Sequence, residues 1–327
     1  MTAPTVTVPP GYGQPGTAAC LLRLRACFPE PDVSSMTQLR AALVLLLIVL
    51  HTLVHALPLL ALALCKLAMP TAGLRRAFGR ALAWIAESWI AANTWMVDHL
   101  TATRFHVSGD EGLDRDGHYL VLANHQSWVD IIVLQKVFNR RIPLMRFFLK
   151  QQLFWVPVLG LAWWALDFPF MGRYSRAQIA KNPQLGERDM EATRRACEKF
   201  RAMPVAMMNF VEGTRFTPGK HARQDSPYRH LLKPKAGGVA FVIDAMGEGL
   251  HAVLDVTIAY PGGRPTMIDL MGGRIPDVHV LVRQRPIPDQ QAMGGRYQED
   301  RAVRARFQQW LNGLWQDKDA ELRRLLD

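Results

Sequence analysis

Cysteine is scarce in this sequence, which has four in 327 residues, and no two of them show the Cys-x-x-Cys spacing of a zinc site. They are Cys20, Cys27, Cys65 and Cys197, and Cys65 lies inside an apolar run. We therefore expect neither a disulfide framework nor a structural zinc ion. A reducing compartment is the default for such a chain, and its catalytic part is expected to face the cytosol.

Two common signatures of catalysis and nucleotide binding are also missing. No Gly-x-Ser-x-Gly elbow occurs, which argues against an α/β-hydrolase. The segment after Gly213 superficially resembles a phosphate-binding P-loop. However, Gly213 and Gly219 enclose five residues instead of four, and His221 stands where a Ser or Thr is required.

Negative charge is in short supply. There are 28 acidic residues against 39 basic ones, giving a formal net charge of +11. This surplus favours anionic partners, whether nucleic acid, an anionic membrane surface or a phosphorylated substrate. Hydrophobic residues make up 49% of the chain, so a wholly disordered protein is excluded and a packed core is expected.

Charge of either sign is absent between Arg40 and Lys66. As a helix at ~1.5 Å per residue, the run from Ala41 to Cys65 would be ~37 Å long, enough to cross a hydrocarbon core of ~30 Å. Pro58 is compatible with either a kinked spanning helix or a hairpin that enters one leaflet. Basic residues flank both ends, so the charge bias sets no orientation. Membrane association follows in either case.

Two further patterns lie in this region. His51 and His55 share a helix face at a metal-ligand spacing, but no carboxylate or cysteine partner is nearby. We interpret them as polar residues tolerated in a membrane helix. Residues 74–103 are helical in composition, and Trp84, Trp89 and Trp95 suit either an interfacial helix or a core helix of the following domain.

From residue 104 onward, short apolar strands alternate with helical segments. This alternation predicts an α/β fold, with a mixed sheet flanked by helices. The predicted strands are Arg104–Ser108, Tyr119–Ala123, Val205–Val211, Val253–Ala259, Thr266–Leu270 and Val278–Arg283. The predicted helices are Ser127–Asn139, Glu187–Met203, Gly237–Met246 and an amphipathic C-terminal helix, Arg301–Leu326.

The first candidate site is Asn-His-Gln-Ser-Trp-Val-Asp at residues 124–130, between a strand and a helix. His125 and Asp130 cannot share a helix face, so they meet only if His125 lies in the turn before the helix. Ser127 as N-cap would give that arrangement. A carboxylate bonded to one imidazole nitrogen leaves the other free to accept a proton. The alternative is a capping box in which Asp130 only satisfies backbone N–H groups.

The second candidate site is Glu-Gly-Thr-Arg at residues 212–215, at the carboxyl end of a predicted strand, where ligands bind in α/β sheets. Gly213 permits a sharp turn and close approach of a ligand. The guanidinium of Arg215 suits bidentate binding of phosphate. Taken alone, the segment is better explained as a surface Glu–Arg pair that closes a turn.

The two motifs together, in this order and about 85 residues apart, resemble the 1-acylglycerol-3-phosphate acyltransferase family. The resemblance covers residues ~100–285 and implies that family's glycerolipid acyltransferase fold. The variants Glu-Gly-Thr-Arg-Phe-Thr and Lys233-Pro-Lys-Ala-Gly-Gly238 resemble the branch of lysocardiolipin and related lysophospholipid acyltransferases.

The resemblance implies roles for individual residues. His125 matches the family's catalytic histidine and Asp130 its aspartate partner. Glu212, Gly213, Thr214 and Arg215 match the motif that binds the glycerol phosphate acceptor. Lys150 and Arg173 match further phosphate ligands or substrate-binding positions.

The chain is accordingly expected to consist of a mobile tail (1–36), membrane-associated helices (37–103), an acyltransferase domain (104–285) and a C-terminal amphipathic helix (286–327). The implied reaction transfers an acyl chain from acyl-CoA or acyl carrier protein to a lysophospholipid hydroxyl, at the cytoplasmic membrane. It requires no metal, cofactor or nucleic acid. The rival interpretation is a non-catalytic, membrane-tethered basic protein that binds anionic lipid, which would not need both His125 and Asp130.

Overall fold

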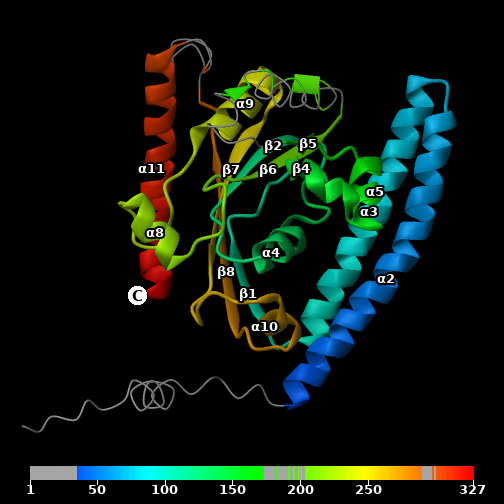
Figure 1. Ribbon diagram of the computed structural model, residues 1–327, viewed down its shortest axis with the longest axis horizontal. Coiled ribbons are helices and arrows are strands. Elements are labelled where there is room, and N and C mark those ends of the chain that lie inside the picture. The colour runs from blue at the N-terminus through cyan, green and yellow to red at the C-terminus, as the bar shows by residue number, and fades with distance from the viewer. Residues whose placement is uncertain are drawn as a thin grey trace, which may run out of the picture.

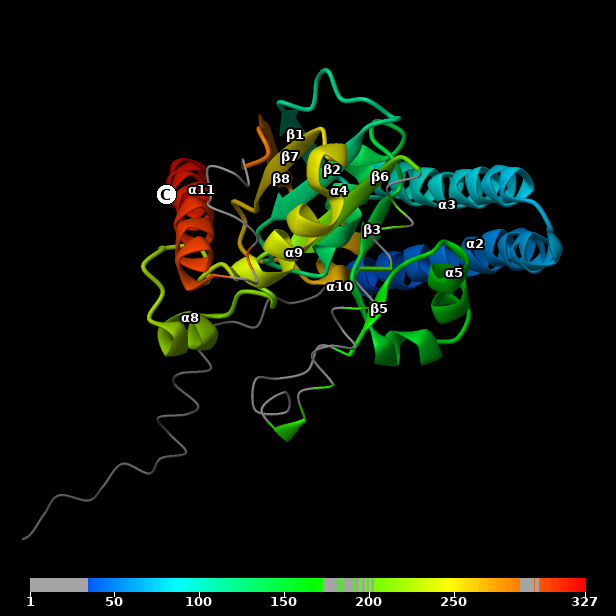
Figure 2. The same ribbon diagram turned by 90° about the horizontal axis from the view of Figure 1, so that it is seen from above.

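The computed structural model describes residues 35–172, 203–288 and 300–327, together with residues 181, 182, 184, 191, 194, 195, 198, 200 and 297. The tail predicted at 1–36 therefore lies outside the described residues except at its end, as do most of the helix predicted at Glu187–Met203 and the candidate ligand Arg173. Figures 1 and 2 show a long helical hairpin along one side of a central sheet and helix α11 on the opposite side.

The central sheet has six strands in the order β1-β8-β7-β2-β6-β3. Only the β7–β8 pair is antiparallel, so the sheet is mixed, as predicted. The strands are β1 (Arg104–Ser108), β2 (His118–Ala123), β3 (Met145–Phe147), β6 (Val205–Phe210), β7 (Ala252–Ala259) and β8 (Asp277–Arg285). Five of the six strands predicted from the sequence are present, with bounds shifted by no more than two residues.

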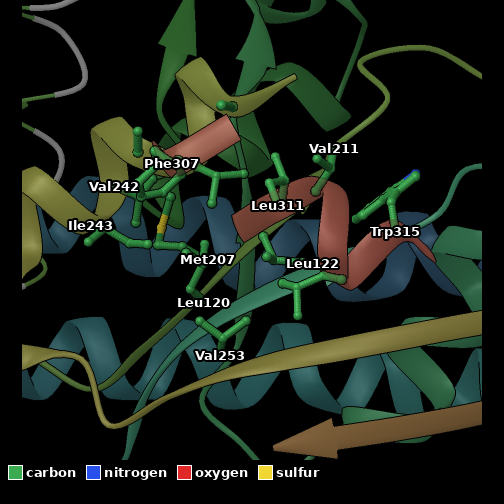
Figure 3. Packing of buried hydrophobic residues seen from close by; sticks show 14 of the residues in the cluster. Leu120, Leu122, Met207, Val211, Val242, Ile243, Val253, Phe307, Leu311 and Trp315 are labelled. Atoms are coloured by element: carbon green, nitrogen blue, oxygen red, sulfur yellow. The ribbon is translucent and has the colours of Figure 1, made fainter. Parts of the chain in front are cut away.

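Both faces of the sheet are covered, which explains why Leu120 to Ala123 of the central strand β2 are all apolar and fully buried. In β2, Leu120 and Leu122 face one cluster, and Val121 and Ala123 face the other. The first cluster contains α9 (Ala236–Met246) and α11 (Arg301–Leu326), and Figure 3 shows Phe307 and Leu311 packed among its members. The second contains α4 (Val129–Phe138).

Helices α2 (Ser35–Ala68) and α3 (Ala72–Leu100) form the hairpin. Helix α2 continues through Pro58, so the chain turns after Ala68 and not at the proline. The side chain of Thr71 caps α3 by accepting the Leu74 N–H at 3.3 Å. The hairpin packs on the sheet domain through α5 (Leu159–Ala165) and the segment after it.

One side of α2 is apolar and exposed. The helix is long and apolar enough to cross a membrane, and only 17% of its most apolar stretch is buried. A core helix of a soluble domain would be mostly buried, so this exposed apolar surface is consistent with membrane association. The exposed apolar side chains on α2 include Leu43, Leu46, Leu50, Leu53, Val54, Leu57, Leu64 and Leu67.

One predicted strand is wrong. Residues Thr266–Leu270 do not form a strand but enter α10 (Met267–Met271). Thr266 and Asp269 form a capping box, in which each side chain bonds to the backbone N–H of the other residue, and this starts a helical turn. The apolar alternation that suggested a strand instead places Leu270 in the core and Ile268 on the surface.

Several short elements were not predicted. These are the edge strand β3 of the central sheet, β4 (Leu149–Lys150) and β5 (Phe170–Met171), which pair with each other, the 3-10 helices η1 (Gln151–Trp155) and η2 (Gly247–Gly249), α5, and α8 (Pro218–Gln224). Each is too short for a periodic pattern to emerge from the sequence.

Candidate active site

Three neighbouring parallel strands bring the polar motifs together. Because β7, β2 and β6 run in the same direction, their carboxyl ends meet at one edge of the sheet. Tyr260 follows β7, Asn124 and His125 follow β2, and Glu212 follows β6. Asn124 ties two of these strands together, since its amide donates to the Ile258 carbonyl and accepts from the Ile258 N–H, both at 2.9 Å.

His125 and Asp130 form the expected pair, with Nδ1 of His125 2.8 Å from Oδ2 of Asp130. Asp130 is fully buried, and the same oxygen accepts the backbone N–H groups of Gln126 at 2.6 Å and Ser127 at 2.8 Å. A carboxylate only accepts, so the shared proton lies on Nδ1 of His125 and Nε2 is left as an acceptor. Asp130 is therefore both a histidine partner and a cap of the turn before α4.

Ser127, the predicted N-cap, lies one residue before the observed one. The N-cap of α4 is Trp128, whose side chain makes no capping bond. The Ser127 hydroxyl instead accepts the Val129 N–H at 3.1 Å and donates to the Pro265 carbonyl at 2.5 Å. It thus links the histidine turn to the loop before α10.

The other oxygen of Asp130 accepts a hydrogen bond from the Tyr260 hydroxyl at 2.7 Å. Burial, together with the neighbouring Asp130 carboxylate, raises the pKa of Tyr260 well above its ordinary value. Tyr260 therefore remains a neutral donor. The sequence analysis did not assign it a role, because the adjacency of β7 and β2 depends on sheet order.

The imidazole of His125 is held on several sides. Its ring stacks on Phe210, with centroids 3.8 Å apart and planes 10° apart. Its backbone carbonyl accepts the Phe216 N–H at 2.8 Å, and its backbone N–H donates to Oε1 of Glu212 at 3.3 Å. The second motif thus fixes the main chain of the first.

Glu212 does not lie where the resemblance to the family implied. Its side chain is fully buried and is not among the residues that line the cavity. Its carboxyl group accepts the backbone N–H groups of His125 and Leu232, the latter at 3.2 Å. Burial raises the pKa of Glu212 to about 8. This geometry gives Glu212 a positioning role in place of contact with an acceptor phosphate.

The rest of the second motif faces the cavity. Gly213 has φ +69°, a left-handed conformation that favours glycine, and Arg215 places its guanidinium over the Trp128 ring at 4.7 Å. The ammonium of Lys220 donates to the Thr214 hydroxyl at 2.7 Å and to the Arg215 carbonyl at 2.9 Å, which holds the loop.

A cavity of about 1540 Å³ lies between the hairpin and the sheet domain and includes His125 in its lining. Three basic residues, Lys150, Arg215 and Lys235, also line it. In the part of the chain that the structure describes, none of the three forms an ion pair with a carboxylate. The remaining lining is mostly apolar and comes from α2, α3, α4, α5 and α10.

The cavity therefore brings together His125, Lys150, Gly213, Thr214 and Arg215, all of which were predicted from the sequence, with Asp130 behind His125. The sequence predicted no separate role for Lys235, which belongs to the segment Lys233-Pro-Lys-Ala-Gly-Gly238. It is positioned by its backbone N–H, which donates to the Val211 carbonyl at 2.9 Å. An unpaired cationic group beside a polarised histidine, at the end of an apolar cavity, suits an amphiphilic substrate with an anionic head group.

Comparisons with known proteins agree with this arrangement. Residues 104–261 match the family model named Acyltransferase. The chain is 24% identical over 259 residues to lysocardiolipin acyltransferase 1 of Gallus gallus, covering 74% of this chain and 63% of that protein. It is 27% identical over 220 residues to 1-acyl-sn-glycerol-3-phosphate acyltransferase 2 of Brassica napus, covering 63% of this chain and 54% of that protein.

Among solved structures, the crystal structure of the 1-acyl-sn-glycerophosphate (LPA) acyltransferase PlsC from Thermotoga maritima aligns with a TM-score of 0.49 and 18% identity, covering 85% of this chain and 97% of that chain. The matched part of this chain spans less than two thirds of the length of the two curated relatives above. The family match includes both motifs and the strands β2, β6 and β7 that present them. Residues 104–261 are therefore similar to an acyltransferase domain of this family.

Proposed function

We propose that this protein transfers an acyl chain from an acyl thioester to the free hydroxyl of lysophosphatidic acid or a related lysophospholipid. The observation that carries the proposal is the position of the His125–Asp130 pair, at a large apolar cavity that also presents three cations with no carboxylate partner among the described residues. The curated relatives named above are acyltransferases whose names specify lysocardiolipin or 1-acyl-glycerol-3-phosphate.

His125 is the general base in this proposal. Its Nε2 takes the proton of the acceptor hydroxyl as that oxygen attacks the thioester carbonyl carbon. A carbon–oxygen bond forms, the carbon–sulfur bond breaks, and the proton passes from Nε2 to the departing thiolate. Asp130 stabilises the imidazolium that exists between these events, and Tyr260 and two backbone N–H groups keep the carboxylate in place.

Arg215, Lys150 and Lys235 bind the acceptor phosphate. The guanidinium of Arg215 offers a planar fork for two phosphate oxygens, while the lysines contribute point charges. Their side chains are exposed, as an entering head group requires. Arg173, which the family resemblance also assigns to substrate binding, lies outside the described residues.

Glu212 acts indirectly. By accepting the His125 and Leu232 N–H groups, it fixes the turn that carries the base against the segment that leads to Lys235. A shift of a reacting group by ~1 Å can cost about 10²-fold in rate, so a buried group that fixes this turn matters to turnover.

The apolar cavity accommodates acyl chains, and the exposed side of α2 holds the site at the membrane where those chains reside. We place the catalytic domain on the cytosolic side, where acyl-CoA and acyl carrier protein are available. Both donors carry phosphate groups, which the basic surface would attract.

The experiment is an assay of purified protein with a panel of lysophospholipids and both donors, with products identified by mass. His125→Ala should lower turnover by ~10²–10⁴-fold while the protein remains folded. His106→Ala is a matched control, because His106 also contacts an aspartate, Asp277, at 2.8 Å, but on an exposed strand outside the cavity. Retained lipid binding with no product from any pair would favour a non-catalytic lipid-binding protein.

A further inference from the structure

Polar side chains interrupt the apolar wall of the cavity where α2 meets α3. We call His51, Thr52, His55, Trp89 and Asn93 the hairpin cluster. Four of them, all but His51, line the cavity. On helices whose other cavity-lining residues are mostly apolar, such groups are costly unless they have partners.

Part of the cluster is satisfied internally. The Trp89 indole N–H donates to the Thr52 hydroxyl at 2.9 Å, and that hydroxyl donates to the Ile48 carbonyl at 2.6 Å. Nε2 of His51 lies 2.8 Å from Oδ1 of Asn93, and Nδ1 of His55 lies 2.8 Å from the His51 carbonyl. These bonds fix the rings and the amide in place.

Two groups on the cavity wall are left over. Asn93 is 9% exposed, and its Nδ2 has no hydrogen-bond partner among the described residues. Because Nδ1 of His55 faces a carbonyl, it carries the proton, and Nε2 is an acceptor that likewise has no described partner. The rings of His51 and His55 are 5.4 Å apart, and His51 contacts Asn93, so a free donor and a free acceptor belong to one small region.

We propose that Asn93 and His55 bind a hydroxyl group carried by a fatty acyl chain; this inference rests on the proposed function. A hydroxyl oxygen can accept from the Asn93 amide while its hydrogen is donated to Nε2 of His55. A methylene group can do neither. A metal ion fits less well, since the cavity lining contains no carboxylate or thiol, and Nε2 of His51 and Nδ1 of His55 are already engaged in hydrogen bonds.

The hairpin cluster lies part-way along the part of the cavity that would hold the acyl chain. At the end nearest His125, Val44 packs on Met271 of α10, and the loop before α10 contacts Ser127. From Val44 to Thr52 is ~12 Å along α2, and the cavity wall continues beyond the cluster to Leu59. The recognised hydroxyl is therefore expected in the middle of the chain and not beside the carbonyl.

The test uses acyl-CoA donors of one chain length, either unsubstituted or with a hydroxyl at successive positions. Binding is measured to the His125→Ala protein, in which turnover is blocked, and transfer is measured with the wild type. A mid-chain hydroxyl should improve binding on the order of 10-fold relative to its neighbours, as expected for two hydrogen bonds. Asn93→Leu, and separately His55→Leu, should abolish that preference without weakening binding of the unsubstituted donor.

His99→Leu is the matched control. Its ring also bonds to the carbonyl one turn earlier, that of Trp95 at 2.9 Å, but His99 does not line the cavity. A second arm places the hydroxyl on the lysophospholipid's own chain, which shows whether donor or acceptor occupies the region. If no hydroxyl position is preferred in either arm, or if the preference survives both leucine variants, the inference is refuted. Failure of transfer with preserved binding preference would instead refute the proposed reaction alone.

Discussion

Replacing Asp130 by asparagine separates its two structural contributions. Oδ2 accepts from His125 and from two backbone N–H groups, and Oδ1 accepts from Tyr260. The backbone donors will orient the new amide with its oxygen toward them, so Nδ1 of His125 keeps its acceptor and its tautomer. What the substitution removes is the negative charge.

The substitution should lower stability. Hydrogen bonds to charged groups contribute ~1.5–3 kcal/mol and neutral ones ~0.5–1.5 kcal/mol. The difference is ~1 kcal/mol for each bond, and three bonds on Oδ2 weaken together, so the free energy of unfolding should fall by ~3 kcal/mol. The Tyr260 hydroxyl can accept from the new NH₂ group, but its own hydrogen then loses its acceptor, and this buried donor adds to the cost.

The substitution should also slow the reaction. At ~4 Å and an effective dielectric constant near 20, a carboxylate stabilises an imidazolium by about 4 kcal/mol. This stabilisation exists only once His125 has taken the proton, so its loss falls on kcat. With ~1.4 kcal/mol per factor of ten, turnover per folded molecule should drop between ~10²- and ~10³-fold.

Urea unfolding and steady-state kinetics on the same preparation measure the two effects. Asp277→Asn, which alters the exposed His106 pair, controls for loss of a histidine-bound carboxylate elsewhere. A loss of stability with activity per folded molecule within a factor of three of wild type would make Asp130 a helix cap alone, and the assignment of His125 as a charge-stabilised base would fall with it.

Three further predictions concern the second motif. Arg215→Lys should raise the acceptor KM and leave the donor KM little changed. Arg215→Ala should weaken acceptor binding further, by ~2–5 kcal/mol. If both variants instead change the donor KM equally, Arg215 does not bind the acceptor. Because the pKa of Glu212 is about 8 when folded and near its ordinary value when unfolded, the native state binds the extra proton, so stability should fall as pH rises from ~5 to ~8. Urea unfolding across that range should show a flatter decline for Glu212→Gln, and an unchanged slope would contradict the assigned pKa. Gly213→Ala should cost ~1–2 kcal/mol at φ +69°. Its new Cβ would lie 3.2 Å from Nζ of Lys235, so a higher acceptor KM should accompany the stability loss; a change in donor KM alone would argue against this site for the head group.

Local patterns were enough to predict the elements that dominate the fold. The predicted bounds of α11 match the structure because Asp300 caps its first turn and an apolar stripe runs from Val303 to Leu322. Strand β2 was recognisable because burial on both faces demands an uninterrupted apolar run. The segment at Thr266 was misread, although the Thr-x-x-Asp capping pattern was visible, since five residues carry too little periodicity to decide.

The sequence predicted which residues belong to the candidate site, but not which groups their side chains contact. The motif identified Glu212 as important, yet its partners are backbone N–H groups contributed by His125 and by Leu232, which comes 20 residues later in the chain. Tyr260 reaches Asp130 only because β7 lies beside β2, and Lys235 reaches the cavity through a backbone bond to Val211. Such relations follow from strand order, which spacing along one chain does not encode.

The two motifs are best understood as one structural unit centred on His125. Asp130 fixes its ring, and the loop of the second motif fixes its main chain at both ends, through Glu212 on the N–H and Phe216 on the carbonyl. The same loop carries Arg215, so the proposed base and the proposed phosphate ligand are held by a common set of bonds. A loop that moved away from β2 would lose both at once, and the buried carboxyl group of Glu212 holds it there through the His125 N–H.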